Sequence, residues 1–122
     1  MRLLVSGTRH QSPEIRKLVD GELDFYFDQW ESNLFLILGD AKGVDTYARE
    51  WAEKREIDHV ICYANWRGFG RSAGVIRNSK MMSFVPEKAV VFPAPDSKGT
   101  LNMISQLAKG RVTTRKVSVS IP

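Results

Sequence analysis

The sequence has little of what several classes of protein require. It holds one cysteine, Cys62, so no internal disulfide can form, and this cysteine stands in an apolar run where a reduced core thiol is expected. With two histidines in the whole chain, a zinc site is not expected either. No apolar run reaches the ~18 residues of a membrane span, and the first residues lack a signal-peptide pattern. We therefore expect a cytoplasmic protein without a membrane span, a metal ion or a required cofactor.

Two familiar nucleotide-binding signatures are missing as well. No stretch fits G-x-x-x-x-G-K-[ST], so a P-loop ATPase is not expected. Residues 68–74 imitate the dinucleotide pattern G-x-G-x-x-G, but they follow the third predicted strand instead of the first. No local context suggests a Ser-His-Asp set.

The remaining composition is that of an ordinary globular protein. With 122 residues, 43% of them hydrophobic and 26% charged, we expect a single domain over residues 1–122 with one core. Charge is uneven: residues 1–58 carry a net −4 and residues 59–122 a net +8. A basic C-terminal half suits a phosphate-bearing partner, although a nucleic-acid surface or a solvated face would account for it equally well.

Short apolar runs alternate with segments of helical periodicity. The predicted strands are 2–6, 34–38, 59–64, 88–92 and a segment from 112 onward that includes Val117, Val119 and Ile121; the predicted helices are 13–31, one that begins near 44, 73–84 and 99–109, with 65–72 as a loop. This order predicts an α/β protein, a Rossmann-like three-layer domain with a mostly parallel five-stranded sheet. In the last helix, Leu101, Ile104, Leu107 and Ala108 are expected to face the core.

Two of the predicted helices begin at a glycine-bearing turn that follows a buried strand. The first turn consists of Gly39, Asp40, Ala41, Lys42, Gly43, Val44 and Asp45, and the second contains Lys98, Gly99 and Thr100. A helix start leaves backbone N–H groups unpaired at the positive end of the helix dipole, and glycine lets a ligand approach the backbone. The carboxyl ends of parallel strands meet at one edge of a sheet, where such folds bind ligands. The two turns therefore predict a site for a phosphate-bearing nucleotide.

Other residues at the same edge have a functional and a structural interpretation. Arg9, in the turn Gly7-Thr8-Arg9 after the first strand, could clamp a phosphate or be a surface arginine. Trp66 could stack on a base, which is worth about 1–3 kcal/mol, or close over the core. Arg77 and Asn78 on the third predicted helix could reach the ligand or stay solvated.

Asp45 also has two interpretations, because it can complement the helix dipole or accept a hydrogen bond from a ribose hydroxyl. Two helix starts contribute about 1–2 kcal/mol together, whereas micromolar binding needs about 8 kcal/mol. Arginine contacts and stacking must therefore supply most of the affinity.

Taken together, these motifs resemble the YspA-like, cpYpsA-related branch of the SLOG superfamily, which is related to the LOG cytokinin-activating hydrolases and to DprA. The motifs are Gly7-Thr8-Arg9, the turn 39–45, Ala48, Trp51-Ala52, Asn65-Trp66, Gly70, Ala73-Gly74, Arg77-Asn78, Met81 and Lys98-Gly99-Thr100. The resemblance covers residues 3–112 and implies a Rossmann-like fold that binds nucleotides, or NAD- and ADP-ribose-derived ligands, at the strand edge. It also implies that Gly99 and Thr100 lie against a phosphate, with Gly39, Gly43 and Asp45 in the neighbouring turn and Arg77 close by.

One departure from the LOG pattern P-G-G-x-G-T-x-x-E bears on activity, because Met103 stands where the glutamate would be. Another carboxylate, Asp45 or Asp40, would then have to act at the N-glycosidic bond. Three functions stay open: a module that senses or sequesters a nucleotide, a hydrolase of an N-glycosidic or phosphoester bond that uses Asp45 as base or nucleophile, and a DNA- or RNA-binding accessory protein. Which nucleotide is bound, and whether the protein forms a homo-oligomer, are not decided by the residues.

Overall fold

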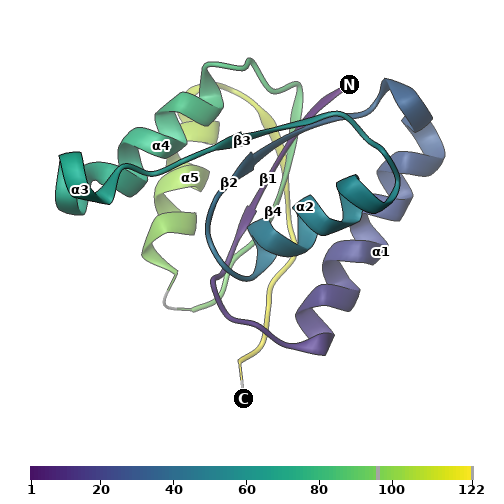
Figure 1. Ribbon diagram of the computed structural model, residues 1–122, viewed down its shortest axis with the longest axis horizontal. Coiled ribbons are helices and arrows are strands. Elements are labelled where there is room, and N and C mark those ends of the chain that lie inside the picture. The colour runs from purple at the N-terminus through teal and green to yellow at the C-terminus, as the bar shows by residue number, and fades with distance from the viewer. Residues whose placement is uncertain (96, 122) are drawn as a thin grey trace.

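A computed structural model of the chain describes residues 1–95 and 97–121 (Figure 1). Its strands are β1 (Arg2–Gly7), β2 (Phe35–Gly39), β3 (His59–Cys62), β4 (Lys88–Phe92) and β5 (Thr113–Lys116). They form one sheet in the order β3-β2-β1-β4-β5, and every neighbouring pair is parallel. The predicted five-stranded parallel sheet is confirmed.

Helices cover both faces of this sheet. They are α1 (Pro13–Trp30), α2 (Val44–Lys54), α3 (Trp66–Phe69), α4 (Ala73–Met82) and α5 (Lys98–Lys109), with short 3₁₀ turns η1 (Glu31–Asn33) and η2 (Gly70–Ser72). Figure 1 shows α1 and α2 on one side of the strands and α4 and α5 on the other. Because both faces are covered, alternate residues of β1 enter different cores: Leu3 and Val5 pack with α1 and α2, whereas Leu4 packs with α4 and α5. The structure is therefore the predicted three-layer Rossmann-like α/β fold.

The chain reverses its direction across the sheet between β1 and β4. The first three strands are added outward from β1 on one side, and β4 and β5 are added on its other side. Ligands of open α/β sheets bind outside the carboxyl ends of the strands at such a switch point. Here that point lies beside Gly7 and Phe92, which are partners at the ends of β1 and β4.

Local signals place α1 as predicted, but they miss the short helix α3. At α1 the Ser12 hydroxyl accepts the Ile15 N–H at 3.1 Å, and Pro13 is the first helical residue. The predicted loop 65–72 is instead α3 followed by η2. Asn65 caps α3 by accepting the Gly68 N–H at 2.9 Å, and a helix this short is invisible to a test for apolar periodicity.

The last strand is also shorter than predicted. β5 ends at Lys116, so the alternation of Val117, Val119 and Ile121 does not mark a strand. The segment still runs beside the end of β4, because Val117 N–H donates to the Val91 carbonyl at 2.8 Å and Val119 N–H donates to that of Pro93 at 3.1 Å. The alternation therefore reflects contact with the core, because Val119 is buried in the cluster on the α1 and α2 side and Val117 packs against it. We call this segment, residues 117–119, the strap.

The buried face of α5 agrees with the predicted one only in part, because Leu107 is buried and Ile104 packs against the core as predicted, whereas Ala108 is exposed. Its buried residues are Thr100, Met103 and Leu107, whereas Leu101 is 55% exposed. Met103 is fully buried in the core cluster that contains Leu4 and Val91. The position that holds a glutamate in the LOG pattern thus points into the core, away from any ligand.

This placement predicts that Met103→Glu lowers stability instead of supplying a catalytic acid. A carboxylate buried without a partner costs about 3 kcal/mol or more, so the midpoint of urea unfolding should fall steeply. Leu101→Glu is the matched control, because its side chain is already largely in solvent and its midpoint should change little. Equal midpoints for the two variants would contradict the assignment of the α5 face.

Candidate functional site

A pocket of about 470 Å³ lies at the carboxyl edge of the sheet, beside the switch point. Its volume falls in the range of roughly 300–1,000 Å³ that small-molecule sites occupy. Of the residues singled out in the sequence, those that line it are Gly7, Thr8, Arg9, Ala41, Asp45, Trp66, Arg77, Asn78, Lys98, Gly99 and Thr100. The structure thus brings four segments that are far apart in the sequence to one cavity: 7–9, 41–45, 66–78 and 98–100.

The turn after β1 is held by the buried residue Thr8. Its N–H donates to the Phe92 carbonyl at 3.0 Å, and its own carbonyl accepts the Val44 N–H at 3.1 Å. Its hydroxyl accepts the His10 N–H at 3.2 Å, which closes the turn locally. The turn is therefore tied to β4 and to α2, and Arg9 follows it at the pocket.

Four of the singled-out residues, Gly39, Asp40, Gly43 and Val44, do not line the pocket. Gly43 has φ +75°, and a Cβ there would stand 2.5 Å from the Thr8 carbonyl oxygen. The Val44 N–H, the amide expected at a ligand, already donates to Thr8. This amide of α2 is thus used to dock against the neighbouring turn, while Ala41 and Asp45 of the same predicted turn line the pocket.

The start of α5, in contrast, is open toward the pocket. Ser97 stands at the N-cap position without a side-chain cap bond within the described chain; its hydroxyl accepts the Ala94 N–H at 3.2 Å instead. Lys98, Gly99 and Thr100 all line the pocket. Among the described side chains, none caps either of the two predicted helix starts, but at α2 the Val44 N–H is bonded to Thr8, whereas three residues in the first turn of α5 line the pocket.

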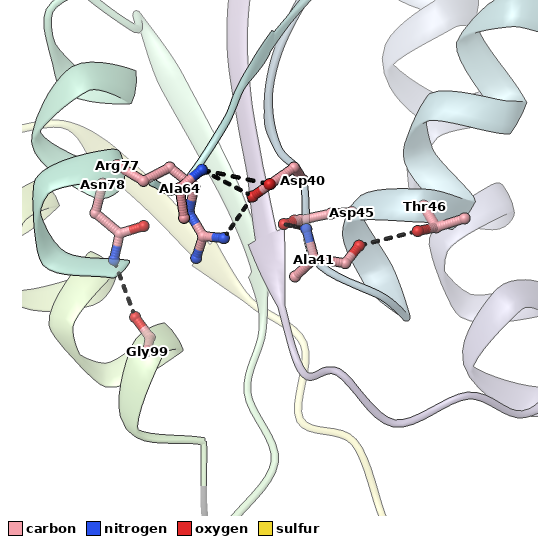
Figure 2. A network of polar contacts seen from close by, with 8 residues as sticks. All are labelled: Asp40, Ala41, Asp45, Thr46, Ala64, Arg77, Asn78 and Gly99. Atoms are coloured by element: carbon pink, nitrogen blue, oxygen red, sulfur yellow. Dashed lines mark hydrogen bonds and ion pairs between the residues drawn. The ribbon is translucent and has the colours of Figure 1, made fainter. Parts of the chain in front are cut away.

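Asn78 fixes this helix start from the side of α4. Its amide donates to the Gly99 carbonyl at 3.2 Å and to the Asn102 side-chain oxygen at 3.0 Å. Figure 2 shows Asn78 pointing at Gly99, next to Arg77 on the same turn of α4. One turn of α4 therefore serves two parts of the pocket.

Arg77 and two aspartates form a charged cluster in which Arg77 and Asp45 are buried and Asp40 is exposed. Arg77 Nη1 lies 2.9 Å from Asp40 Oδ1, and the Asp40 carboxylate also accepts the Ala64 N–H at 3.3 Å (Figure 2). Asp45, 5% exposed, accepts the Ala41 N–H at 3.1 Å through Oδ2. Gly39 makes room for the cluster, since a Cβ there would stand 2.6 Å from Asp45 Oδ2 and 3.3 Å from Arg77 Nε.

The surroundings of Asp45 raise the pKa of its carboxyl group above the usual value. Burial raises the pKa of Asp45 from 3.8 to about 6, and the Ala41 N–H and the charge of Arg77 oppose this rise without cancelling it. A carboxyl that titrates near neutrality in a cleft is a frequent mark of a functional site. Asp45 is thus the titratable group of the pocket that its surroundings alter most among the described residues.

Cations and an aromatic ring complete the wall. The Arg9 guanidinium lies 5.4 Å from the centre of the Trp66 ring, which is 48% exposed. Arg71 and Lys98 add positive charge to the lining. With Arg77 these residues outnumber the one lining acid, so the pocket suits an anion.

Sequence reasoning missed other residues that line the cavity: Ser6, His10, Arg71, Gly74, Val75, Ser97 and Asn102. Arg71 was hidden in the stretch predicted to be a featureless loop. Asn102 lies three residues after Gly99, and this spacing places both on one helix face. That signal could have indicated Asn102, and not its neighbour Met103, as the side chain at the pocket.

Two further searches concern metals and membranes. Within the described residues, no group of three or more His, Cys, Asp or Glu side chains is arranged to hold a metal ion. None of the helices in residues 1–95 and 97–121 combines the length and the apolar character that a membrane crossing demands.

Comparisons with known proteins agree with the fold. Residues 1–69 match the model of the YspA, cpYpsA-related SLOG family. The Gene 61 protein of Mycobacterium phage D29 is 29% identical over 84 residues, which are 65% of this chain and 67% of the phage protein. The X-ray structure of DNA processing protein A (DprA) from Streptococcus pneumoniae aligns with 93% of this chain at a TM-score of 0.58 and 14% identity. The chain spans 57% of that DprA chain, and a likeness at this identity shows the fold alone.

The raised pKa of Asp45 makes a prediction about stability. Because the folded protein holds the Asp45 proton up to about pH 6 and the unfolded chain releases it near 3.8, the free energy of unfolding should fall as pH rises between these values. Asp45→Asn removes this dependence and keeps an acceptor for Ala41. Above about pH 7 it should be more stable than the natural protein by up to about 3 kcal/mol.

Urea unfolding followed by circular dichroism across this pH range measures the difference. The matched change Asp28→Asn, at an exposed position of α1, should alter the stability little. A natural protein whose stability rises between pH 3.8 and 6, relative to Asp45→Asn, would contradict the burial argument.

Proposed function

We propose that this chain, which belongs to the YspA, cpYpsA-related SLOG family, binds a nucleotide or an NAD- or ADP-ribose-derived ligand in the pocket and senses, sequesters or processes it. The observation that carries the proposal is the uncapped start of α5, which faces a cavity lined by cations. Free amides at a helix start and positive side chains together favour a phosphate.

The phosphate would lie at Gly99 and Thr100. Both residues line the pocket, and glycine adds no side chain that would hold the ligand away from the backbone. The hydroxyl of Thr100 can donate a further hydrogen bond, and Lys98 and Arg71 add charge. This corner offers the donors that a phosphate oxygen accepts, and no carboxylate from α5 opposes it.

The base would lie toward Trp66. Its exposed ring offers a stacking surface worth about 1–3 kcal/mol. Arg9, which now lies over that ring, can reach either a base or a phosphate. Because a helix start supplies about 1 kcal/mol, these contacts must provide most of the affinity of a micromolar ligand.

Removing either contact should weaken binding without unfolding the protein. Thr100→Val keeps the side-chain shape and should weaken ADP or ADP-ribose binding about five- to tenfold, and Arg9→Ala about tenfold or more. Isothermal calorimetry measures both. Thr113→Val and Arg49→Ala are matched controls on β5 and α2, away from the pocket. Unchanged affinity in both pocket variants would reject the proposed site.

A second candidate function, hydrolysis of the ligand, is favoured by Asp45. Its carboxyl lines the pocket, and its pKa of about 6 suits a group that accepts or donates a proton near neutrality. In cleavage of an N-glycosidic bond to adenine, the ionised Asp45 would take a proton from water as the water oxygen bonds to the sugar carbon. The bond from that carbon to the base nitrogen would break, and the departing base would take up a proton from the solvent.

Chromatography of ADP-ribose, NAD and AMP after incubation with the protein tests this second function. Turnover should be lost at least about a hundredfold in Asp45→Asn and kept in Asp28→Asn. Ligands that bind and stay intact would exclude the hydrolase and retain the binding function.

A further inference from the structure

Two polar atoms of the charged cluster have no hydrogen-bond partner in the part of the chain that the structure describes. They are Asp45 Oδ1, an acceptor, and Arg77 Nε, a donor, and both are buried. Asp45 is 5% exposed and Arg77 is 8% exposed, yet both residues line the pocket. A buried polar group without a partner costs free energy, so its persistence calls for an explanation.

Hydrogen bonds at other atoms hold the two side chains in place. The Asp40 carboxylate accepts a hydrogen bond from Arg77 Nη1 and a second one from the Ala64 N–H. The Arg77 guanidinium is therefore held at Nη1 (Figure 2). Asp45 is fixed at its other oxygen by the Ala41 N–H. Each side chain is therefore anchored through one polar atom while a second stays unused.

Both side chains border the same small space. A Cβ placed on Gly39 would stand 3.3 Å from Arg77 Nε and 3.4 Å from the Asp45 carboxyl carbon. The unused acceptor and donor thus belong to groups that converge at the end of β2. A side chain on residue 39 would fill the space that their approach requires.

The chemistry of this pair selects the group that would meet it. A phosphate oxygen accepts a hydrogen bond from Arg77 but is repelled by the Asp45 carboxylate. An ammonium group donates to the Asp45 carboxylate but is repelled by the Arg77 guanidinium. A hydroxyl both donates and accepts, so it can give its proton to Asp45 Oδ1 and accept from Arg77 Nε at the same time. Sugar hydroxyls are the groups of this kind in a nucleotide.

We propose that Asp45 and Arg77 recognise a ribose hydroxyl and make the pocket selective for ribonucleotides over deoxyribonucleotides. This inference rests on the proposed function, because it assumes that a nucleotide occupies the pocket. The same turn of α4 relates the two ends of the ligand: Arg77 points to the aspartates, and Asn78 holds the start of α5 where the phosphate would lie (Figure 2).

Calorimetry with ADP, 2′-deoxy-ADP and 3′-deoxy-ADP tests the selectivity. A site that hydrogen-bonds a hydroxyl rejects the analogue that lacks it, so at least one deoxy compound should bind about tenfold or more weakly than ADP. In Asp45→Asn the affinity for ADP and the affinity for the discriminated deoxy compound should become nearly equal. The exposed change Asp28→Asn should leave the ratio of these two affinities unchanged.

Arg77→Lys provides a second, independent variant, because lysine keeps a positive charge for Asp40 and removes the Nε donor. It should reduce the same selectivity through Arg77 alone, and circular dichroism reports folding for each variant. If both deoxy compounds bind as tightly as ADP, or if the folded variants keep the natural ratio, the hydroxyl assignment is overturned and nucleotide binding stands. If none of the three nucleotides binds, the proposed function is overturned together with it.

Discussion

The hydrogen bonds of Thr8 are the constraint on which the rest of the pocket depends. Through its N–H and its carbonyl this residue ties the end of β1 to Phe92 on β4 and to Val44 at the start of α2. These bonds join the two sides of the switch point, where β1 and β4 are neighbours in the sheet but are not consecutive in the chain. They also use the first amide of α2 internally, so this N–H is bonded within the protein.

The fold could be predicted because its signals are local and repeated. Runs such as the one in β2 are buried on both faces, so they are apolar throughout, and their alternation with helices leaves a parallel sheet as the simple solution. The elements that were predicted wrongly also have a physical explanation. Helix α3 depends on a single side-chain cap, and the apparent strand at Val119 is a strap of chain beside β4.

The site was predictable in outline for a geometric reason, since parallel strands bring the loops at their carboxyl ends together. Its details depend on contacts between residues distant in sequence, which periodicity cannot reveal. Whether Val44 faces a ligand depends on a carbonyl at Thr8, and whether residue 103 faces the pocket depends on the rotation of α5 over Leu4 and Val91. Asn102 and Arg71 likewise line the pocket because of tertiary packing.

The strap after β5 has a consequence for how the pocket is prepared. Val119 donates to the Pro93 carbonyl at the beginning of the segment that leads into α5, and within that segment Ala94 and Ser97 are bonded to each other. The far side of α5 is held by Asn78. The start of α5 is thereby held from two directions. The entropy of ordering this corner is lost when the chain folds, so a ligand of the proposed kind would not have to order it again on binding.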